Sequence, residues 1–276
     1  MMSSVQPGSL WVVATPIGHR EDLSARAIET LRAVAVIAAE DTRHSRPLMV
    51  HHGIDTPLIA LHEHNERDAV GAIVRRLSAG DSVALISDAG TPLISDPGFR
   101  LVRAARAAGV RCIPVPGACA AIAALSVAGL PSDRFVFEGF LPPKAAARRS
   151  RLQVLAGDGR TVIFYESSHR VAESLADMRD IFGEDREAVL ARELTKMFET
   201  VIGEPLGALA ARVAADPDQQ RGECVILLAG RGEEADAKLA EGQRMFLILR
   251  EELPPAKAAK LAALISGAPR KLLYQG

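Results

Sequence analysis

Short apolar runs alternate with helical patterns along the first half of the chain. The runs are almost continuously apolar, and they lie at residues 10–15, 34–39, 57–61, 82–87 and 111–115. Strands that are apolar on both sides are typical of a parallel sheet that helices cover on each face. Helical patterns lie between them, one beginning at Ser24, one over roughly 66–79, and one over 97–108 that ends at Gly109. The pattern predicts an α/β domain with a parallel sheet over residues 8–130.

The second half repeats this alternation with fewer helical patterns than strand-like runs. The runs lie at residues 134–140, 161–166, 187–193, 198–203 and 224–230. Helical patterns lie near residues 146–156, 168–182 and 205–215. A shortage of connecting helices favours a mixed sheet, because parallel neighbours need a crossover and antiparallel neighbours do not. We therefore expect a second α/β domain with a mixed sheet over residues 131–232.

Residues 233–276 carry only helical patterns. From residue 237 onward this tail has seven basic and three acidic side chains, so its net charge is +4. Two of its helical stretches meet at a turn at Gly267, which suits a helix-turn-helix hairpin. A plain packing appendage explains the pattern equally well. In either case we expect a small basic helical appendage.

The charge and the cysteines limit the possible partners and compartments. The 276 residues have a net charge of −1, so no large positive field surrounds the whole surface, and a nucleic acid would need local basic patches. The three cysteines fit neither a disulfide framework nor a paired zinc spacing, which favours a reducing cytoplasm. Residues 112–132 are 21 positions without a charge, but Pro114, Pro116 and Gly117 interrupt them. We expect a buried helix there and no membrane span, and the first nine residues show no export signal.

Polar loops follow the strands of the first predicted sheet, where open parallel sheets bind ligands. The loop at 15–22 lacks the G-x-G-x-x-G spacing, which disfavours a Rossmann dinucleotide site. The sequence EDTR at 40–43 is either a cap with a salt bridge or part of a site. The sequence SDAGTPLISDPG at 87–98 has two glycines and two prolines that make a rigid polar loop. We expect this loop to bind a polar small molecule rather than to serve only as a turn. Residues 114–120 lead through Pro-Gly into a helix N-terminus, where free backbone donors can meet a carboxylate.

Charged motifs also end strands of the second half. The sequence FYESSHR lies at 164–170, and ARELTKMFE lies at 191–199. Either could be a set of surface ion pairs. The basic segment at 142–151 is a solvated helix face by default, or a phosphate-contact patch if the substrate is a nucleic acid.

Taken together, these motifs resemble one family. The blocks WVVATPIGHREDLS, AAEDTRHSRPLM, HEHNE, ALISDAGTPLISDPG, VPGACAAIAAL, FEGFLP, VIFYESSHR and RELTKMFE resemble, in this order, those of the ribosomal RNA small subunit methyltransferase I family, a branch of the tetrapyrrole methylase superfamily. The resemblance covers about residues 8–230, and the basic tail is similar to that family's C-terminal appendage. Two positions depart from the pattern, because Cys119 stands where serine is common and Ser168 where proline is common.

The resemblance implies an enzyme made of two α/β domains with S-adenosylmethionine in the cleft between them. It implies a cytoplasmic homodimer that methylates the 2′-hydroxyl of a cytidine ribose in the decoding region of 16S rRNA. The residues that match the family's cofactor site are Pro16, Ile17, Gly90, Thr91, Pro92, Ile94, Cys119, Ala120 and Tyr165. A tetrapyrrole or protein methyltransferase of the same superfamily and a non-catalytic RNA-binding module are the alternatives.

The implied chemistry needs alignment and a base, and we expect no metal. The methyl carbon of a sulfonium is already activated, so the protein must place the ribose oxygen and withdraw its proton. The candidate catalytic residues, which the sequence does not rank, are Glu166, His169, Lys196 and Glu199. The candidate phosphate contacts are the basic side chains of Arg43, Lys144, Arg148, Arg149, Arg151, Arg170 and Arg192.

Overall fold

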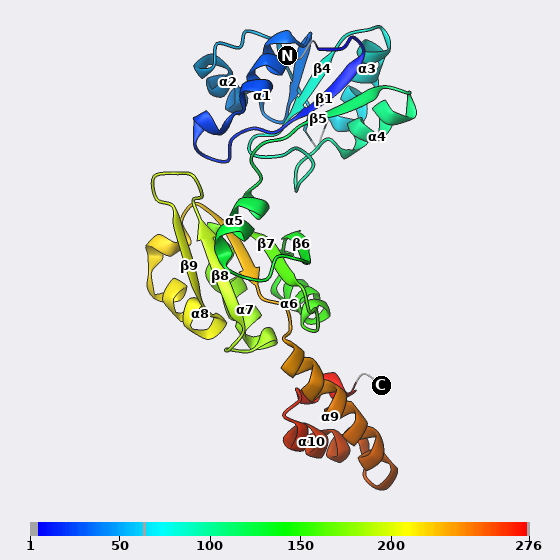
Figure 1. Ribbon diagram of the computed structural model, residues 1–276, viewed down its shortest axis with the longest axis vertical. Helices are drawn as coiled ribbons and strands as arrows, with labels where there is room; N and C mark the ends of the chain where they lie inside the picture. Colours follow the sequence, from blue (N-terminus) through cyan, green and yellow to red (C-terminus); the bar gives the residue numbers. More distant parts are fainter. Residues whose placement is uncertain (1–4, 63–64, 275–276) are drawn as a thin grey trace.

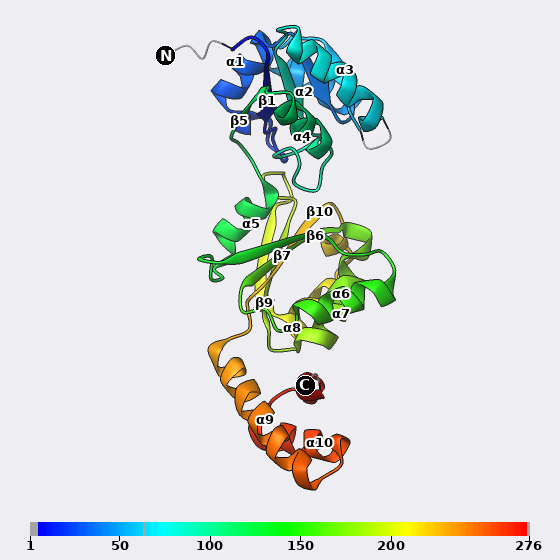
Figure 2. The same cartoon turned by 90° about the vertical axis from the view of Figure 1, so that its right-hand side faces the viewer.

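The computed structural model describes residues 5–62 and 65–274 of the chain. Two α/β domains and a helical tail follow one another along its longest axis (Figure 1). A turn of 90° shows the same succession, with the sheet of each domain seen from another side (Figure 2). The expected α/β class is therefore confirmed, and the order of the three parts agrees with the expected order.

The first domain holds a five-stranded parallel sheet. Its strands are β1 (Ser9–Val13), β2 (Val36–Ala39), β3 (Leu58–Ala60), β4 (Val83–Ile86) and β5 (Arg111–Val115), in the spatial order β3-β2-β4-β1-β5. Its helices are α1 (Ala25–Ala33), α2 (Thr42–His51), α3 (Glu66–Ser78) and α4 (Phe99–Ala107). One apolar core lies beside α1 and α2, and another lies beside α3 and α4. Because each strand contributes side chains to both cores, the runs are apolar at nearly every position.

The helix ends follow from local chemistry. The Ser24 hydroxyl accepts a hydrogen bond from the Ala27 amide at 3.1 Å, so it caps α1 as predicted. Helix α2 was not predicted, because Pro47 lies inside it and proline usually ends a helix. Burial of Ser45 and Met49 on one side of α2 holds the helix despite that proline.

Helix α5 (Ala120–Ala128) connects the two domains (Figure 2). It lies in the uncharged stretch 112–132, which divides into β5, a Pro-Gly turn and this short helix. Its buried residues Ala121, Ala124 and Leu125 pack on the second sheet. Among the residues that the structure describes, no helix combines the length and the apolar character that a bilayer crossing requires.

The second domain holds a mixed sheet, as predicted. Its strands are β6 (Phe135–Phe140), β7 (Thr161–Ser167), β8 (Glu187–Arg192), β9 (Thr200–Pro205) and β10 (Glu223–Leu228), in the order β6-β7-β10-β8-β9. Only the β6–β7 pair is parallel among these neighbours. Helix α5 covers one face, and the other face carries α6 (Ala145–Leu155), α7 (Val171–Phe182) and α8 (Leu206–Ala215).

The tail folds around a small core of its own. It consists of α9 (Glu233–Glu252), α10 (Pro255–Ser266) and the 3-10 turn η4 (Arg270–Tyr274). Phe246 of α9 packs with three alanines of α10 and with Leu273. We propose domain limits at 8–130, 131–232 and 233–276, with α5 as the linking helix that precedes the first boundary and packs on the second sheet.

Candidate functional site

The loops that leave β1 and β4 are joined where these neighbouring strands end. The Thr15 amide donates to the Gly90 carbonyl at 2.8 Å, and the Gly90 amide donates to the Thr15 carbonyl at 3.1 Å. Gly90 has a φ of +80°, and a Cβ there would lie 3.3 Å from the Ile17 side chain. A glycine is therefore required at the point where the two loops meet.

The loop at 87–98 holds a strained conformation. Leu93 and Ser95 have φ angles of 75° and 68°, a region that non-glycine residues seldom occupy. Strain of this kind costs about 1–3 kcal/mol per residue and is concentrated at functional sites. Its effect here is to place Ile94 and Asp96, which adjoin the strained residues, on the wall of a pocket.

This pocket is a cleft of about 320 Å³ between the two α/β domains. Its volume lies in the range of small-molecule sites, about 300–1,000 Å³. Both domains contribute to its wall, and the lining residues are Ile17, Ala89, Gly90, Thr91, Ile94, Ser95, Asp96, Cys119, Ala120, Phe140, Tyr165, Glu166, Ser167, Ser168, Ala191, Leu194, Gly222, Glu223, Cys224 and Val225.

The cleft brings together most of the predicted cofactor residues. Those on its wall are Ile17, Gly90, Thr91, Ile94, Cys119, Ala120 and Tyr165. Pro16 and Pro92 are buried and are not among the lining residues, so their contact with a cofactor stays a prediction. Each proline precedes or follows a lining residue and fixes the backbone φ beside it, so its contribution is to the shape of the loop.

Tyr165 joins the two sides of the cleft. Its hydroxyl accepts a hydrogen bond from the Ala121 amide at 3.1 Å, at the start of α5. Its ring packs edge-on against Phe137 and Phe140 at centroid distances of 4.8 and 5.7 Å. Burial raises the pKa of Tyr165, so the side chain remains a neutral phenol. It therefore forms an apolar wall and fixes the helix that links the domains.

Asp96 is one of the cleft residues that are not among the predicted site residues. It is half-buried, and burial together with the charge of Asp88 raises its pKa to about 6, against the lowering effect of a hydrogen bond to Ser87. A carboxylate held in a largely apolar cleft attracts a cationic ligand. The sequence shows Asp96 as the second acid of the predicted rigid loop. Asp88 is a carboxylate in the same loop, so the sequence does not tell which of the two lies in the cleft.

Close contacts hold the first-domain loop at 14–19 against the second domain. The His19 amide donates to the Thr195 hydroxyl at 3.0 Å. A Cβ on Gly18 would lie 2.6 Å from Lys196 Cγ and 3.0 Å from the Leu194 carbonyl. These contacts place Ile17 and Leu194 on the wall of the same cleft.

Comparison with known proteins shows the family of the chain. The profile described as Tetrapyrrole (Corrin/Porphyrin) Methylases matches residues 9–210. A Pseudomonas aeruginosa protein named ribosomal RNA small subunit methyltransferase I is 62% identical over 272 residues, which cover 97% of this chain and 96% of the relative. The chain belongs to the ribosomal RNA small subunit methyltransferase I family. An Escherichia coli O157:H7 relative of the same name is 50% identical over 268 residues, with 97% and 94% covered.

The fold and the tail agree with membership of this methyltransferase family. The solved structure of the methyltransferase CobJ matches with a TM-score of 0.60 and 20% identity, covering 81% of this chain and 94% of the other. That likeness shows the shared tetrapyrrole methylase fold. The profile described as RsmI C-terminal HTH domain matches residues 236–275, so of the two interpretations of the tail the helix-turn-helix is favoured.

Lys196, one of the predicted catalytic residues, lies beside the cleft of this methyltransferase through its contact with Glu223. Its ammonium donates to Glu193 Oε1 at 3.0 Å and to Glu223 Oε2 at 2.7 Å, and Glu223 lines the cleft. Burial lowers the pKa of Lys196, but the hydrogen bonds to the two carboxylates outweigh burial and raise it. Lys196 is therefore a fixed cation, suited to holding negative charge rather than to accepting a proton.

The other predicted catalytic residues have different places. Glu166 lines the cleft, but its carboxylate is fully buried and bonded to Ser167, Arg170 and Ser174, so no oxygen is directed to a substrate. His169 is exposed and is not among the lining residues. Glu199 is exposed, and its Oε2 accepts the Thr195 amide at 2.6 Å, which shapes the loop after β8. The structure thus removes Glu166 from the candidate bases.

Three arginines of α6 are held in ion pairs. Burial corrects the predicted phosphate contact of Arg148, whereas Arg149 and Arg151 are 41% and 45% exposed and stay predicted phosphate contacts. Arg148 is 3% exposed, and its Nε donates to Asp177 at 2.7 Å. Arg149 donates to the same carboxylate at 2.6 Å, and Arg151 donates to both oxygens of Glu138. These pairs join α6 to α7 and to β6. The carboxylates of Asp177 and Glu138 therefore offset part of the positive charge of this segment.

Two further arginines have structural contacts. Arg192 is 7% exposed and donates to the backbone carbonyls of Arg221 and Phe198. The side chain of Arg170 is 18% exposed and donates to the Leu141 carbonyl and to Glu166. Their predicted role in substrate binding is corrected in the same way, because burial keeps both guanidinium groups from an RNA backbone.

Arg43 and Lys144 remain predicted phosphate contacts. Both are exposed, and the Arg43 side chain is 90% exposed although it pairs with Asp41 at 2.9 Å. Arg43 stands at the start of α2, beside the residues that end β2. The Asp41 amide donates to Asp88 at 3.0 Å, which connects this position to the loop that lines the cleft.

Proposed function

We propose that the chain transfers a methyl group from S-adenosylmethionine to the 2′-hydroxyl of a cytidine ribose in the decoding region of 16S rRNA. The observation that carries the proposal is a cleft between two α/β domains in a chain 62% identical to a protein named ribosomal RNA small subunit methyltransferase I. The relative's name supports the RNA of the small ribosomal subunit as substrate.

The lining of the cleft fits S-adenosylmethionine. The Asp96 carboxylate suits a positively charged ligand, and Ile17, Ile94 and Tyr165 suit an apolar ring. When bound, S-adenosylmethionine supplies an activated methyl group, so the transfer needs no metal. The residues proposed to hold it are Ile17, Gly90, Thr91, Ile94, Asp96, Cys119, Ala120 and Tyr165.

In this proposal Lys196 supplies the electrostatic part of catalysis. Its ammonium is held by Glu193 and Glu223 at the rim of the cleft. A fixed cation there lowers the pKa of an approaching hydroxyl and stabilises the oxyanion that forms when the proton leaves. His169 and Glu199 are retained as candidate bases, because both are exposed.

Replacing Lys196 by methionine is expected to slow the methyl transfer step. The loss of one preorganised charge costs about 2.7–4 kcal/mol in related cases, so the rate should fall roughly 100-fold or more. The measurement is the single-turnover rate with labelled S-adenosylmethionine and isolated small ribosomal subunits. Cofactor affinity should change less than about twofold, because Lys196 is not among the residues that line the cleft. A variant with the full rate would exclude Lys196 from catalysis.

The basic tail is expected to contribute to RNA binding and not to cofactor binding. It has its own core, and a chain that ends at Gly232 keeps the cores of both α/β domains. This shortened chain should bind S-adenosylmethionine normally in a calorimetric titration. Its affinity for small subunits should fall roughly tenfold, with a weaker dependence on salt, because several phosphate contacts are lost. Unchanged RNA affinity would contradict a role for the tail.

We also propose a cytoplasmic homodimer. The outer side of α5 exposes Ile122 and Val127 at 50% and 55%, beside the cleft residue Ala120. Apolar side chains on an exposed helix favour contact with another copy of the chain. Light scattering after size exclusion should give twice the chain mass of 29.4 kDa. The free thiols of Cys112, Cys119 and Cys224 support a reducing compartment.

The function is tested by methyl transfer onto isolated small ribosomal subunits, followed by mapping of the modified nucleotide. Label should appear on the ribose of one cytidine of the decoding region, and heating in alkali should leave the bond after it intact because the 2′-hydroxyl is blocked. Label on a base, or transfer to a tetrapyrrole and none to RNA, would contradict the proposal.

A further inference from the structure

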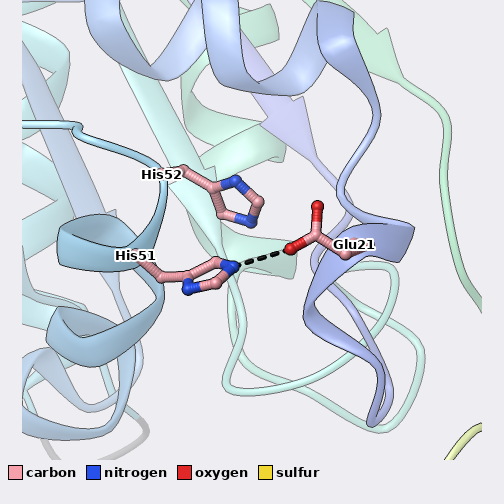
Figure 3. Close-up of side chains that lie close together, drawn as sticks. All are labelled: Glu21, His51 and His52. Carbon is pink, nitrogen blue, oxygen red and sulfur yellow. Dashed lines mark hydrogen bonds and ion pairs between the residues drawn. The ribbon is translucent and has the colours of Figure 1, made fainter.

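Glu21, His51 and His52 form a cluster of metal-ligating side chains in the first domain, apart from the cleft. His51 ends α2, His52 follows it, and Glu21 lies in the 3-10 turn η1 (Arg20–Asp22). His51 Nε2 lies 2.7 Å from Glu21 Oε1, and one ligand atom of each side chain lies within 4.8 Å of the others. The Glu21 carboxylate faces both imidazole rings (Figure 3).

The end of α2 fixes the backbone that carries both imidazoles. Gly53 has a φ of +58°, and its amide donates to the Val50 carbonyl at 3.1 Å. The Ile54 amide donates to the Met49 carbonyl at 2.9 Å, and both of these side chains are buried. This pair of bonds and its apolar contact form a Schellman motif, which reverses the chain directly after His52.

Helix α1 holds the same turn from the other side. Arg32 Nε donates to the Gly53 carbonyl at 3.2 Å, and Arg32 Nη2 donates to the His52 carbonyl. The guanidinium is thus directed to the backbone of the turn. A metal site gains affinity when its ligands are fixed before binding, because less conformational freedom is lost on coordination.

We propose that Glu21, His51 and His52 bind one divalent transition-metal ion of the zinc class. Two imidazole nitrogens and one carboxylate oxygen are ligands that zinc commonly takes, and this number leaves a fourth position for water. Tetrahedral ligands with bonds of about 2.0–2.1 Å stand roughly 3.3 Å apart. The side chains of Glu21 and His51 are 65% and 38% exposed, so rotation about their own bonds can reach this spacing.

Binding exchanges one interaction for another. In the free protein His51 Nε2 and Glu21 share a hydrogen bond, and the metal takes the place of the proton between them. A neutral His51 then carries that proton on Nδ1, and a doubly protonated His51 releases one proton to water. His52 Nε2 exchanges its contact with the Arg20 carbonyl, 3.1 Å away, for the metal.

The consequence is a clamp on the loop that leaves β1. This loop carries Ile17, which lines the cleft, and the His19 amide, which bonds to Thr195 of the second domain. Glu21 lies two residues beyond His19 in the same loop. A metal that ties Glu21 to α2 therefore stabilises the first-domain wall of the cleft. The site itself does not depend on the reaction proposed for the cleft.

The test is a zinc titration of the full-length, metal-free protein without a histidine tag. Calorimetry should show one zinc ion per chain, and cobalt should give the visible absorption of a low-coordinate site. Changing even an outer-shell partner of a metal ligand typically costs 10–100-fold in affinity. The substitution Glu21→Gln and the double substitution His51→Ala/His52→Ala should therefore each weaken zinc binding roughly tenfold or more.

The control is His44→Ala, which removes an exposed histidine from the same helix and should leave zinc binding unchanged. Zinc should also raise the melting temperature of the parent and of His44→Ala, and not that of the double variant. Comparable melting temperatures of the metal-free forms would show that the substitutions leave the fold intact. Equal zinc affinity in the parent and the double variant, or the absence of stoichiometric binding in the parent, would overturn the proposal.

Discussion

Replacing Asp96 by asparagine should weaken binding of S-adenosylmethionine roughly 30- to 150-fold, equivalent to about 2–3 kcal/mol. The carboxylate is half-buried on the wall of the cleft, where solvent screens its charge poorly. Removing one member of a buried charge pair usually costs binding free energy. We take the low end of the usual range because Asp96 is not fully buried. Calorimetric titration measures the loss.

Asp88→Asn is the matched control in the same loop. Asp88 accepts the Asp41 amide at 3.0 Å, an amide oxygen can replace that acceptor, and Asp88 is not among the lining residues. Its affinity should remain within about threefold of the parent. An Asp96→Asn protein with the parent's affinity would show that the carboxylate does not serve the cofactor.

The same carboxylate predicts a pH dependence of cofactor binding. Because burial raises the pKa of Asp96 to about 6, the group is ionised above this pH and becomes protonated below it. Attraction to a cationic ligand requires the ionised form, so affinity should fall as the pH is lowered from 7 to 5. At pH 5 the Asp96 carboxyl is ionised in about a tenth of the free protein molecules, which predicts roughly tenfold weaker cofactor binding than at pH 7. Asp96→Asn should lack this dependence.

Glu166→Gln should destabilise the protein by about 2–4 kcal/mol. The buried carboxylate accepts hydrogen bonds from the Ser167 amide at 2.9 Å, the Ser174 hydroxyl at 2.5 Å and Arg170 Nη2 at 3.2 Å. A glutamine presents one acceptor oxygen and a donor amide to these donors, and it leaves Arg170 without a counter-charge. Urea unfolding measures the change.

Glu173→Gln is the control for this prediction. Glu173 lies on α7, is 71% exposed, and contacts Arg148 at 3.4 Å, while Asp177 supplies the shorter contact to the same guanidinium. Its free energy of unfolding should change by less than about 1 kcal/mol. If Glu166→Gln kept the parent's stability while losing turnover, Glu166 would return to the list of candidate bases.

Secondary structure could be predicted from the sequence wherever both faces of an element are buried. The strands β1, β2 and β4 contribute to two cores at once, so their runs are continuously apolar and easily recognised. The mixed second sheet followed from the scarcity of helices. Helix α2 was not predicted, because Pro47 interrupts its helical pattern and the helix is held by tertiary packing.

The sequence predicts which loops form the site, but it does not predict the role of each side chain in it. Gly90 and Tyr165 stand out by position and residue type, and both line the cleft. Whether a charge is free depends on partners far along the chain. Arg148 meets Asp177, which is 29 residues away, and no local pattern distinguishes such an arginine from a phosphate contact. Asp88 and Asp96 likewise differ in their surroundings and not in their chemistry.

We propose that loops from both α/β domains enclose the methyl donor. Amide hydrogen exchange with and without S-adenosylhomocysteine tests it most directly. We expect slower exchange in the segments 89–96 and 119–121 and in the segment 222–225 of the second domain, with little change in 233–274. Protection restricted to one domain, or protection that leaves 89–96 unchanged, would contradict it.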